Sequence, residues 1–225
     1  MCGRFARFSP VQKFAGLFGT QAGFNLNPRY NIGPTQALLL ARNTVGGSRE
    51  LAFLHWGLIP HWVKEPKTGY STINARAETV AEKPIFRNPF RHRRCLIAAD
   101  GYYEWCKLER AKQPYFIKLK DGQPFALAGL WEHWAREDQN IDSCAVIVTE
   151  ANALTKPIHD RMPVILSPED YDAWMDPDLQ DPERLKAFLR PYPAERMWAY
   201  PVGTAVSNPK NDKPELMTEA RSISP

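Results

Sequence analysis

Short runs in which apolar and polar positions alternate fill the middle of the chain, and turn residues bound each run. The strand-like runs cover residues 36–42, 51–56, 94–99, 102–107, 114–119, 125–131 and 144–149. Runs of this length that are rich in β-branched and aromatic residues are typical of β-strands. The first two flank Gly46-Gly47 and predict a hairpin, whereas the polar stretch 136–142 is expected to separate the last two strands.

Helical spacing of apolar residues is limited to three short segments. Ser9-Pro10 predicts the start of one helix, with Ser9 as its N-cap and Gly19 at its end. Ser167-Pro168 and Asp181-Pro182 predict the starts of two others. The stripes expected to be buried are Val11/Phe14/Ala15/Phe18, Tyr171/Trp174/Met175 and Leu185/Phe188/Leu189. Because strands outnumber helices and do not alternate with them, the pattern predicts an α+β fold, a single domain with a curved, barrel-like, mainly antiparallel β-sheet and short peripheral helices.

The composition is that of a folded globular chain. Hydrophobic residues make up 44% and charged residues 24% of the 225 positions, which argues against disorder, collagen-like repeats and coiled coils. Twenty prolines and 13 glycines favour many short elements joined by turns. No repeat or linker divides the sequence, so we expect one domain over residues 1–210 and a flexible C-terminal tail over 211–225.

The termini and cysteines predict a cytoplasmic protein. Arg4 and Arg7 stand where a secretory signal would begin its apolar stretch, and no run is long enough to cross a bilayer, so no membrane partner is expected. The four cysteines lack Cys-x-x-Cys spacing and are expected to be free thiols in a reducing compartment. A net charge of +4 gives only a mild attraction to polyanions.

Several enzyme classes lose their support because their motifs are missing. The chain has no Gly-x-Gly-x-x-Gly, Walker, His-Glu-x-x-His or Gly-x-Ser-x-Gly sequence. His55 and His61 have no pair of thiols to complete a zinc site. We therefore expect neither a metal nor another cofactor.

Cys2 has the most distinctive chemistry. Removal of the initiator methionine would leave a free α-amine and a thiol on adjacent carbons, both with pKa values not far above neutrality. An aldehyde would condense with that amine, and the thiol would then close a five-membered thiazolidine ring. The alternative is an ordinary second residue at a frayed terminus.

Three further segments carry candidate site residues. At strand period Asn74 and Arg76 point to one face, where an amide beside a guanidinium suits an anion. Glu104 lies among aromatic residues, which should raise its pKa into a range useful for proton transfer. His159 lies in a proline-bounded loop. The alternatives are an ordinary strand, an exposed edge glutamate and a structural histidine paired with Asp160.

Residues 86–94 form a basic segment in which four arginines alternate with two phenylalanines. This composition suits phosphate neutralisation and base stacking, although a solvated basic face is the alternative. Together with the arginines close to Cys2, it favours an anionic polymer as the partner.

Taken together, these segments resemble the SRAP (SOS response-associated peptidase) family of abasic-site processing proteins. The similar motifs are residues 1–5, 29–34, 56–60, 73–79, 99–105, 158–163 and 206–211. The resemblance implies a barrel-like single domain with a basic groove for single-stranded DNA containing abasic sites. It also implies covalent capture of the abasic sugar by Cys2 after Met1 is removed, with no cofactor and no obligate protein partner, in a bacterial-type minimal protein.

The resemblance also implies roles for single residues. Cys2 resembles the crosslinking nucleophile, and Asn74 the asparagine that holds the thiazolidine region. Glu104 resembles the glutamate that moves protons at the Cys2 amine, and His159 the histidine that assists sugar ring opening and β-elimination.

Four DNA-binding residues are implied in the same way. Arg4 and Arg76 resemble arginines that bind phosphates flanking the lesion, and Pro34 and Trp62 lie near positions that wedge bases apart. Lyase-type cleavage and self-processing of the N-terminus are the further activities that the family suggests.

Two other functions remain open at this point. Class II glutamine amidotransferases also begin Met-Cys-Gly, but their oxyanion hole uses an Asn-Gly pair that this sequence lacks. The second alternative is a noncatalytic single-strand binder in which the arginines and aromatic residues bind DNA and Cys2 is incidental.

Overall fold

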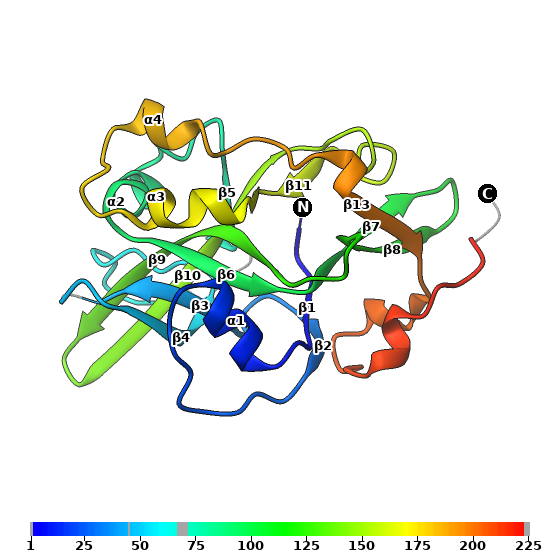
Figure 1. Cartoon of the computed structure of the whole chain (residues 1–225), viewed down its shortest axis with the longest axis horizontal. Coiled ribbons are helices and arrows are strands. Elements are labelled where there is room, and N and C mark those ends of the chain that lie inside the picture. Colours follow the sequence, from blue (N-terminus) through cyan, green and yellow to red (C-terminus); the bar gives the residue numbers. More distant parts are fainter. Residues whose placement is uncertain (1, 45, 67–71, 223–225) are drawn as a thin grey trace.

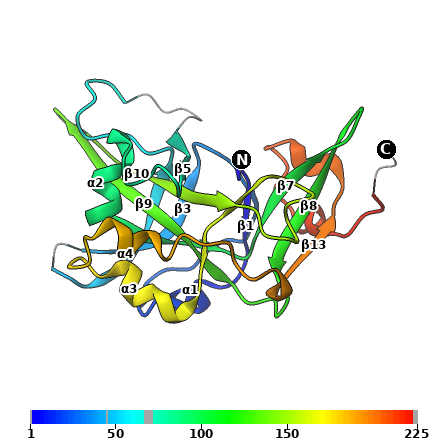
Figure 2. The ribbon, with the colours of Figure 1, turned by 90° about the horizontal axis from the view of Figure 1, so that it is seen from above.

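Two β-sheets lie side by side, and the helices cover their outer faces (Figures 1 and 2). The computed structural model describes residues 2–44, 46–66 and 72–222. The strands are β1 Phe5–Arg7, β2 Arg29–Ile32, β3 Ala37–Asn43, β4 Arg49–Trp56, β5 Asn74–Arg76, β6 Arg94–Ala99, β7 Gly101–Lys107, β8 Lys112–Leu119, β9 Phe125–Arg136, β10 Gln139–Glu150, β11 Arg161–Pro163, β12 Ile165–Leu166 and β13 Met197–Pro201. The α-helices are α1 Val11–Leu17, α2 Pro84–His92, α3 Tyr171–Met175 and α4 Pro182–Lys186, and the 3-10 helices are η2 Pro168–Asp170, η3 Ala194–Arg196, η4 Thr204–Ser207 and η5 Pro214–Met217.

One sheet closes into a barrel. Its strands follow the order β10-β4-β3-β6-β9, and β10 closes the circle because it also pairs with β9. The β10–β4 pairing is parallel, and the other barrel pairings are antiparallel. The second sheet has the order β13-β8-β7-β1-β2 with antiparallel pairings. The predicted barrel-like α+β domain is therefore confirmed.

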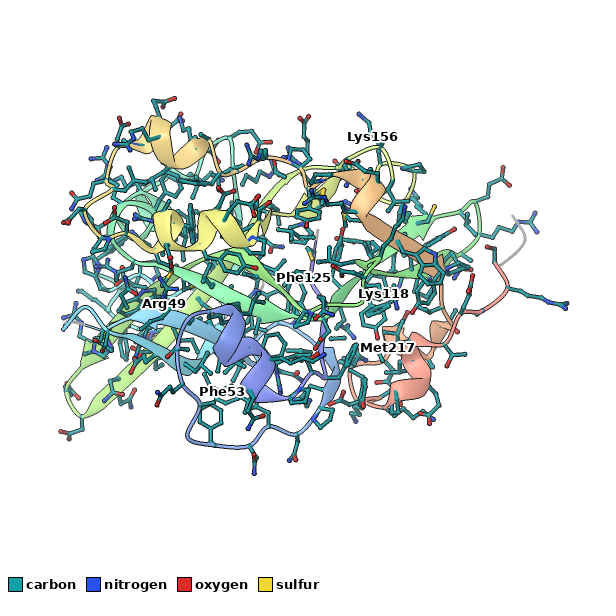
Figure 3. The ribbon with its side chains drawn as sticks, viewed as in Figure 1. Arg49, Phe53, Lys118, Phe125, Lys156 and Met217 are labelled. Carbon is teal, nitrogen blue, oxygen red and sulfur yellow. The ribbon has the colours of Figure 1, made fainter. Side chains whose placement is uncertain are left out.

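Three hydrophobic clusters fill the spaces between these layers. The first lies between the barrel and the helices and contains Phe14 and Phe18 of the first predicted stripe together with the two later stripes, against which Phe188 packs partly buried. The second joins the barrel interior to the inner face of the second sheet, and Phe125 near the centre of Figure 3 belongs to it. The third covers the opposite face of the second sheet, where Met217 packs against it (Figure 3). A strand of the second sheet thus has one face directed at the barrel.

The start of α1 differs from the sequence prediction. Pro10 is the N-cap, and Ser9 makes no cap hydrogen bond to the helix. Instead, the Ser9 backbone N–H and hydroxyl both donate to the buried Asp100 carboxylate, as does the backbone N–H of Phe8 at 2.6 Å. A carboxylate that accepts three hydrogen bonds fixes the end of β1 against the turn before β7.

Local patterning also misjudged two segments. Residues 136–142 do not separate two strands, because β9 and β10 run on and pair as far as Arg136 and Gln139. The basic segment 86–94 overlaps helix α2, whose Phe86 and Phe90 are buried and unavailable for base stacking. The helix was missed because Pro89 and the dense charge obscured its 3.6-residue period.

The segment after residue 210 lies against the body of the protein. Asp212 accepts hydrogen bonds from the backbone N–H groups of Tyr30 and Asn31 and forms an ion pair with Arg29. Leu216 in η5 is buried in the third cluster. The polar composition of this segment gives no indication of this packing. The packing depends on one apolar residue, Leu216, and on partners of Asp212 that are distant in sequence.

A substitution at Gly101 tests how closely β7 packs against β8. A Cβ at Gly101 would lie 2.3 Å from Cζ of Phe116, so Gly101→Ala forces the sheet apart. We expect a loss of about 1–3 kcal/mol in the free energy of unfolding. Urea denaturation followed by circular dichroism measures it.

Gly16→Ala is the matched control, because Gly16 lies in α1 with nothing within 4 Å of an added Cβ. It should stabilise the protein by about 0.5–1 kcal/mol. Equal shifts in the two variants would contradict the packing argument.

Candidate active site

Cys2 is enclosed where the N-terminal segment crosses the inner face of the second sheet. The residue is 0% exposed and packs in the second hydrophobic cluster. In the β1–β7 pairing Phe5 lies opposite Tyr102, and the backbone N–H of Tyr103 donates to the Arg4 carbonyl at 2.9 Å. Continued by two residues, this antiparallel register brings Cys2 to the part of β7 that carries Glu104.

Glu104 is a carboxyl group that exchanges protons near neutral pH. Its side chain points to the same face of β7 as Tyr102, toward the barrel, and the residue is 3% exposed. Burial raises the pKa of Glu104 to about 7, against the opposing effects of the N-terminal positive charge and the Trp105 backbone hydrogen bond. The predicted rise in the Glu104 pKa is thus confirmed, and its cause is desolvation.

The thiol of Cys2 is held in its neutral form. Burial raises its pKa well above the ordinary value, and the negative charge of Glu104 raises it further. Two neighbouring acidic groups in a space of low dielectric resist simultaneous ionisation. A proton leaving the thiol therefore needs an acceptor at the site.

Asn74 connects a barrel strand to Cys2. Strand β5 pairs in parallel with β10, and its Ala75 is fully buried, so Asn74 and Arg76 share the opposite face, as the strand period predicted. The Asn74 amide Nδ2 donates to the Cys2 carbonyl at 2.8 Å. Its Oδ1 is buried without a hydrogen-bond partner in the described part of the chain. An acceptor is thus available beside the backbone of Cys2.

His159 is presented by a tightly bonded turn after β10. The Asn152 side chain accepts hydrogen bonds from the backbone N–H groups of Leu154 and Thr155, and the His159 N–H donates to the Thr155 carbonyl at 2.9 Å. The thiol of Cys106, two residues beyond Glu104 on β7, donates to the Pro157 carbonyl at 3.5 Å. The His159 loop is therefore tied to the strand of Glu104.

The geometry favours a neutral imidazole at His159. Its Nδ1 accepts a hydrogen bond from the Arg161 backbone N–H at 3.0 Å, and burial lowers its pKa. Asp160 lies 2.9 Å from the same nitrogen, but its side chain is 82% exposed, so its attraction for a proton there is weak.

The two arginines expected to bind phosphate have different surroundings. Arg76 is exposed next to Asn74. Arg4 is half-buried, where its guanidinium donates to Asn31 Oδ1 at 2.8 Å and to the Val206 carbonyl at 3.0 Å. The Arg4 guanidinium carbon also lies 5.7 Å from the ring centre of Trp105. Arg4 therefore joins the site strand to the C-terminal segment.

The structure does not connect Pro34 and Trp62 to this group. Trp62 is 42% exposed, and its ring packs edge-on against His61 at 5.0 Å. Pro34 is half-buried before Thr35, which has a left-handed φ of 69°. Within the described ranges, no hydrogen bond or ring contact joins either residue to Cys2, so their role as wedges stays a prediction.

Two asparagines organise the site but were not singled out in the sequence. Asn152 builds the turn that carries His159. Asn31 is fully buried, and its amide Nδ2 donates to the carbonyls of Val206, Asn208 and Asn211. The only sequence signal for either residue was an amide next to a strand, which is common in turns.

Two further properties of the described residues concern metal binding and membranes. No group of three or more His, Cys, Asp and Glu side chains lies in a metal-binding arrangement there. Within the same ranges, no helix has the length and hydrophobicity that crossing a bilayer requires. The four cysteines are free thiols.

Comparison with known proteins decides the family. The family model described as SOS response associated peptidase (SRAP) matches residues 1–209. The chain belongs to the SRAP family. It is 45% identical over 222 residues to the "Abasic site processing protein YoqW" of Bacillus subtilis (strain 168), covering 96% of this chain and 99% of the relative.

More distant relatives cover the chain equally well. The "Abasic site processing protein YedK" of Escherichia coli (strain K12) is 32% identical over 225 residues, which cover 96% of this chain and 99% of that protein. A crystal structure of a protein from Bacteroides thetaiotaomicron is 28% identical, with a TM-score of 0.87, and covers 97% of this chain and 100% of that one. The fold described above is thus the SRAP fold.

The raised pKa of Glu104 predicts a pH dependence of stability. Between the unfolded value near 4.5 and the folded value of about 7, the folded state binds the extra proton. The contribution of Glu104 to stability is therefore fully present below pH 4.5 and is lost as the pH rises through 7. The loss is on the order of 3 kcal/mol.

Glu104→Gln should remove this dependence. We expect the free energy of unfolding of the variant, relative to the unmodified chain, to rise between about pH 5 and pH 8 in urea titrations. Glu109→Gln, at an exposed position, should leave the profile unchanged. Parallel profiles for all three chains would contradict the assignment.

Proposed function

We propose that this protein captures abasic sites in single-stranded DNA by forming a covalent thiazolidine between Cys2 and the ring-opened sugar. The observation that carries the proposal is the enclosed group of Cys2, the Glu104 carboxyl with its pKa of about 7, and the Asn74 amide bonded to the Cys2 carbonyl. The names of the relatives YoqW and YedK, both abasic site processing proteins, support the same substrate.

The chemistry balances without a cofactor. After removal of Met1, the Cys2 amine attacks the aldehyde carbon of the opened sugar, and loss of one water gives a C=N bond. The thiol sulfur then adds to that carbon, its proton passes to the nitrogen, and the ring closes. No oxidant or reductant is needed.

Each neighbouring side chain suits one part of this sequence. Glu104 accepts a proton from the Cys2 amine and returns it to the departing water, which a pKa of about 7 permits. Asn74 fixes the Cys2 backbone and offers Oδ1 to the amine. His159, whose pKa is lowered by burial so that its neutral imidazole is favoured, assists opening of the sugar ring.

DNA binding would use Arg4, Arg76, Pro34 and Trp62. Arg76, exposed beside Asn74, suits a phosphate flanking the lesion. Trp62 presents an exposed ring on which a base can stack. Capture would protect the abasic site during the response to DNA damage, in the cytoplasm of a bacterial cell close to its DNA.

Lyase-type cleavage and self-processing are secondary parts of the proposal. Strand cleavage by β-elimination would use the same Schiff base, with His159 or Glu104 as the proton acceptor. Removal of the residue before Cys2 would be the self-processing step. The noncatalytic binder and the amidohydrolase are the alternatives, and only the covalent proposal requires an aldehyde.

The first test is a denaturing gel of the mature protein with single-stranded DNA that contains one abasic site. We expect a protein–DNA band that survives denaturation, because a C–S and a C–N bond hold it. Undamaged DNA, Cys2→Ala and a chain with one residue added before Cys2 should each give no band. A band of equal strength from Cys2→Ala would refute capture by this residue.

The role of Glu104 is tested by the pH dependence of the crosslinking rate. The rate should rise as Glu104 loses its proton around pH 7. Glu104→Gln should lower the rate at pH 7 by at least about tenfold and remove this step from the profile. DNA affinity, measured with an abasic analogue that lacks an aldehyde, should stay within about twofold. Equal losses of rate and affinity would show that Glu104 is structural.

A further inference from the structure

Helix α2 has one buried face and one basic face. Phe86, Pro89 and Phe90 pack into the core. Lys83, Arg87 and Arg91 are exposed and follow one another at intervals of four residues, so they form one stripe along the helix. At a rise of about 1.5 Å per residue the stripe is about 12 Å long. We call these three side chains the α2 basic face.

Carboxylates do not neutralise this stripe. Arg93 pairs with Glu132, and Arg94 is buried with its guanidinium on backbone carbonyls. Across residues 2–44, 46–66 and 72–222, by contrast, the α2 basic face makes no ion pair. Residues 80–94 contain five Lys or Arg and one Glu, a formal charge of +4 that equals that of the whole chain.

Helix stability does not account for the stripe. Like charges four residues apart destabilise a helix by a few tenths of a kcal/mol per pair. The field of the cluster also acts on His92, whose pKa is lowered first by burial and then by Arg93, Arg94 and Arg91. A concentration of unpaired charge that costs stability is better explained by a ligand that neutralises it.

The α2 basic face lies along a direction that leads away from Cys2. In both Figures 1 and 2, β5 lies between the N-terminal segment and α2. Arg76 ends β5, and Lys83 follows it by seven residues, which limits their separation to about 25 Å. A DNA strand held at Cys2 and Arg76 can therefore continue onto α2.

A phosphate backbone fits this surface better than a membrane does. The exposed positions of α2 are polar or charged apart from Pro84, and no large apolar side chain is fully exposed there. Membrane-bound amphipathic helices need such side chains to enter the lipid. Cations about 6 Å apart along a rigid helix can each contact a phosphate of one strand.

We propose that the α2 basic face is a second DNA-binding surface, which contacts phosphates of the single strand several nucleotides from the abasic site. The proposal rests on the function proposed above and extends its substrate to a longer strand. It predicts that α2 does not contribute to the affinity for short DNA. For long DNA, α2 should contribute a part of the affinity that depends on the salt concentration.

The test removes the three charges together. The variant Lys83→Gln, Arg87→Gln, Arg91→Gln is compared with Lys13→Gln, Lys120→Gln, Arg196→Gln, which removes the same charge from exposed positions around α1 and η3. Those elements lie on the side of the molecule away from β5 in Figure 2. Binding is measured by fluorescence anisotropy with single strands of about 7 and about 21 nucleotides that carry a central tetrahydrofuran abasic analogue.

For the long strand, the α2 variant should bind at least about tenfold more weakly at low salt. Its slope of log affinity against log salt should be lower by about 2, since each single-strand phosphate contact contributes about 0.7. For the short strand, it should match the unmodified chain. The control variant should change neither slope by more than about 0.5.

Two results would overturn the proposal: equal losses in the two variants, or equal losses on short and long strands. Crosslinking of the short strand with a true abasic site is measured in parallel. It tests capture by Cys2 independently, so failure of the α2 proposal and failure of the proposed function give different patterns.

Discussion

The pairing of β1 with β7 is the constraint on which the candidate site depends. It carries the N-terminal segment across the inner face of the second sheet and encloses Cys2 beside the strand of Glu104. The Asp100 carboxylate fixes the other end of β1 through three hydrogen bonds. A terminal residue would ordinarily fray and lose its geometry. Here both strand pairing and side-chain bonds oppose fraying, so a reactive terminus can be held in one position.

Desolvation is the main cause of the shifted pKa values in the candidate site. Burial raises the pKa of the Cys2 thiol and of Glu104 and lowers that of His159. All three groups are therefore biased toward their neutral forms. Glu104, with its pKa of about 7, can give or take a proton near neutral pH at little energetic cost, whereas the Cys2 thiol needs an acceptor beside it to lose its proton. The free energy spent on burying them is supplied by the hydrophobic cluster that joins the two sheets.

Some of the basic side chains are bonded within the protein, whereas others are exposed and available to a ligand. Arg4 and Arg94 are bonded within the protein, and Arg4 serves to hold the C-terminal segment through Asn31 and Val206. Arg76 and the α2 basic face are exposed, and β5, which ends at Arg76, lies on the way from the N-terminal segment to α2 in Figure 2. Their positions suit a strand that enters at Cys2 and extends along α2, which links the proposed capture chemistry to the proposed second surface.

Local patterning in the sequence determined most strands, the approximate places of three helices, the α+β class and the chemistry available at Cys2, because these depend on neighbouring residues. It also indicated that aromatic neighbours would raise the pKa of Glu104. The tertiary structure alone decided which residues meet. Asn74 reaches Cys2 across 72 positions, Asn152 shapes the His159 turn, and Arg94 turns inward while Arg87 and Arg91 turn outward. Side-chain orientation and long-range pairing arise from packing, and a one-dimensional pattern carries no information on either.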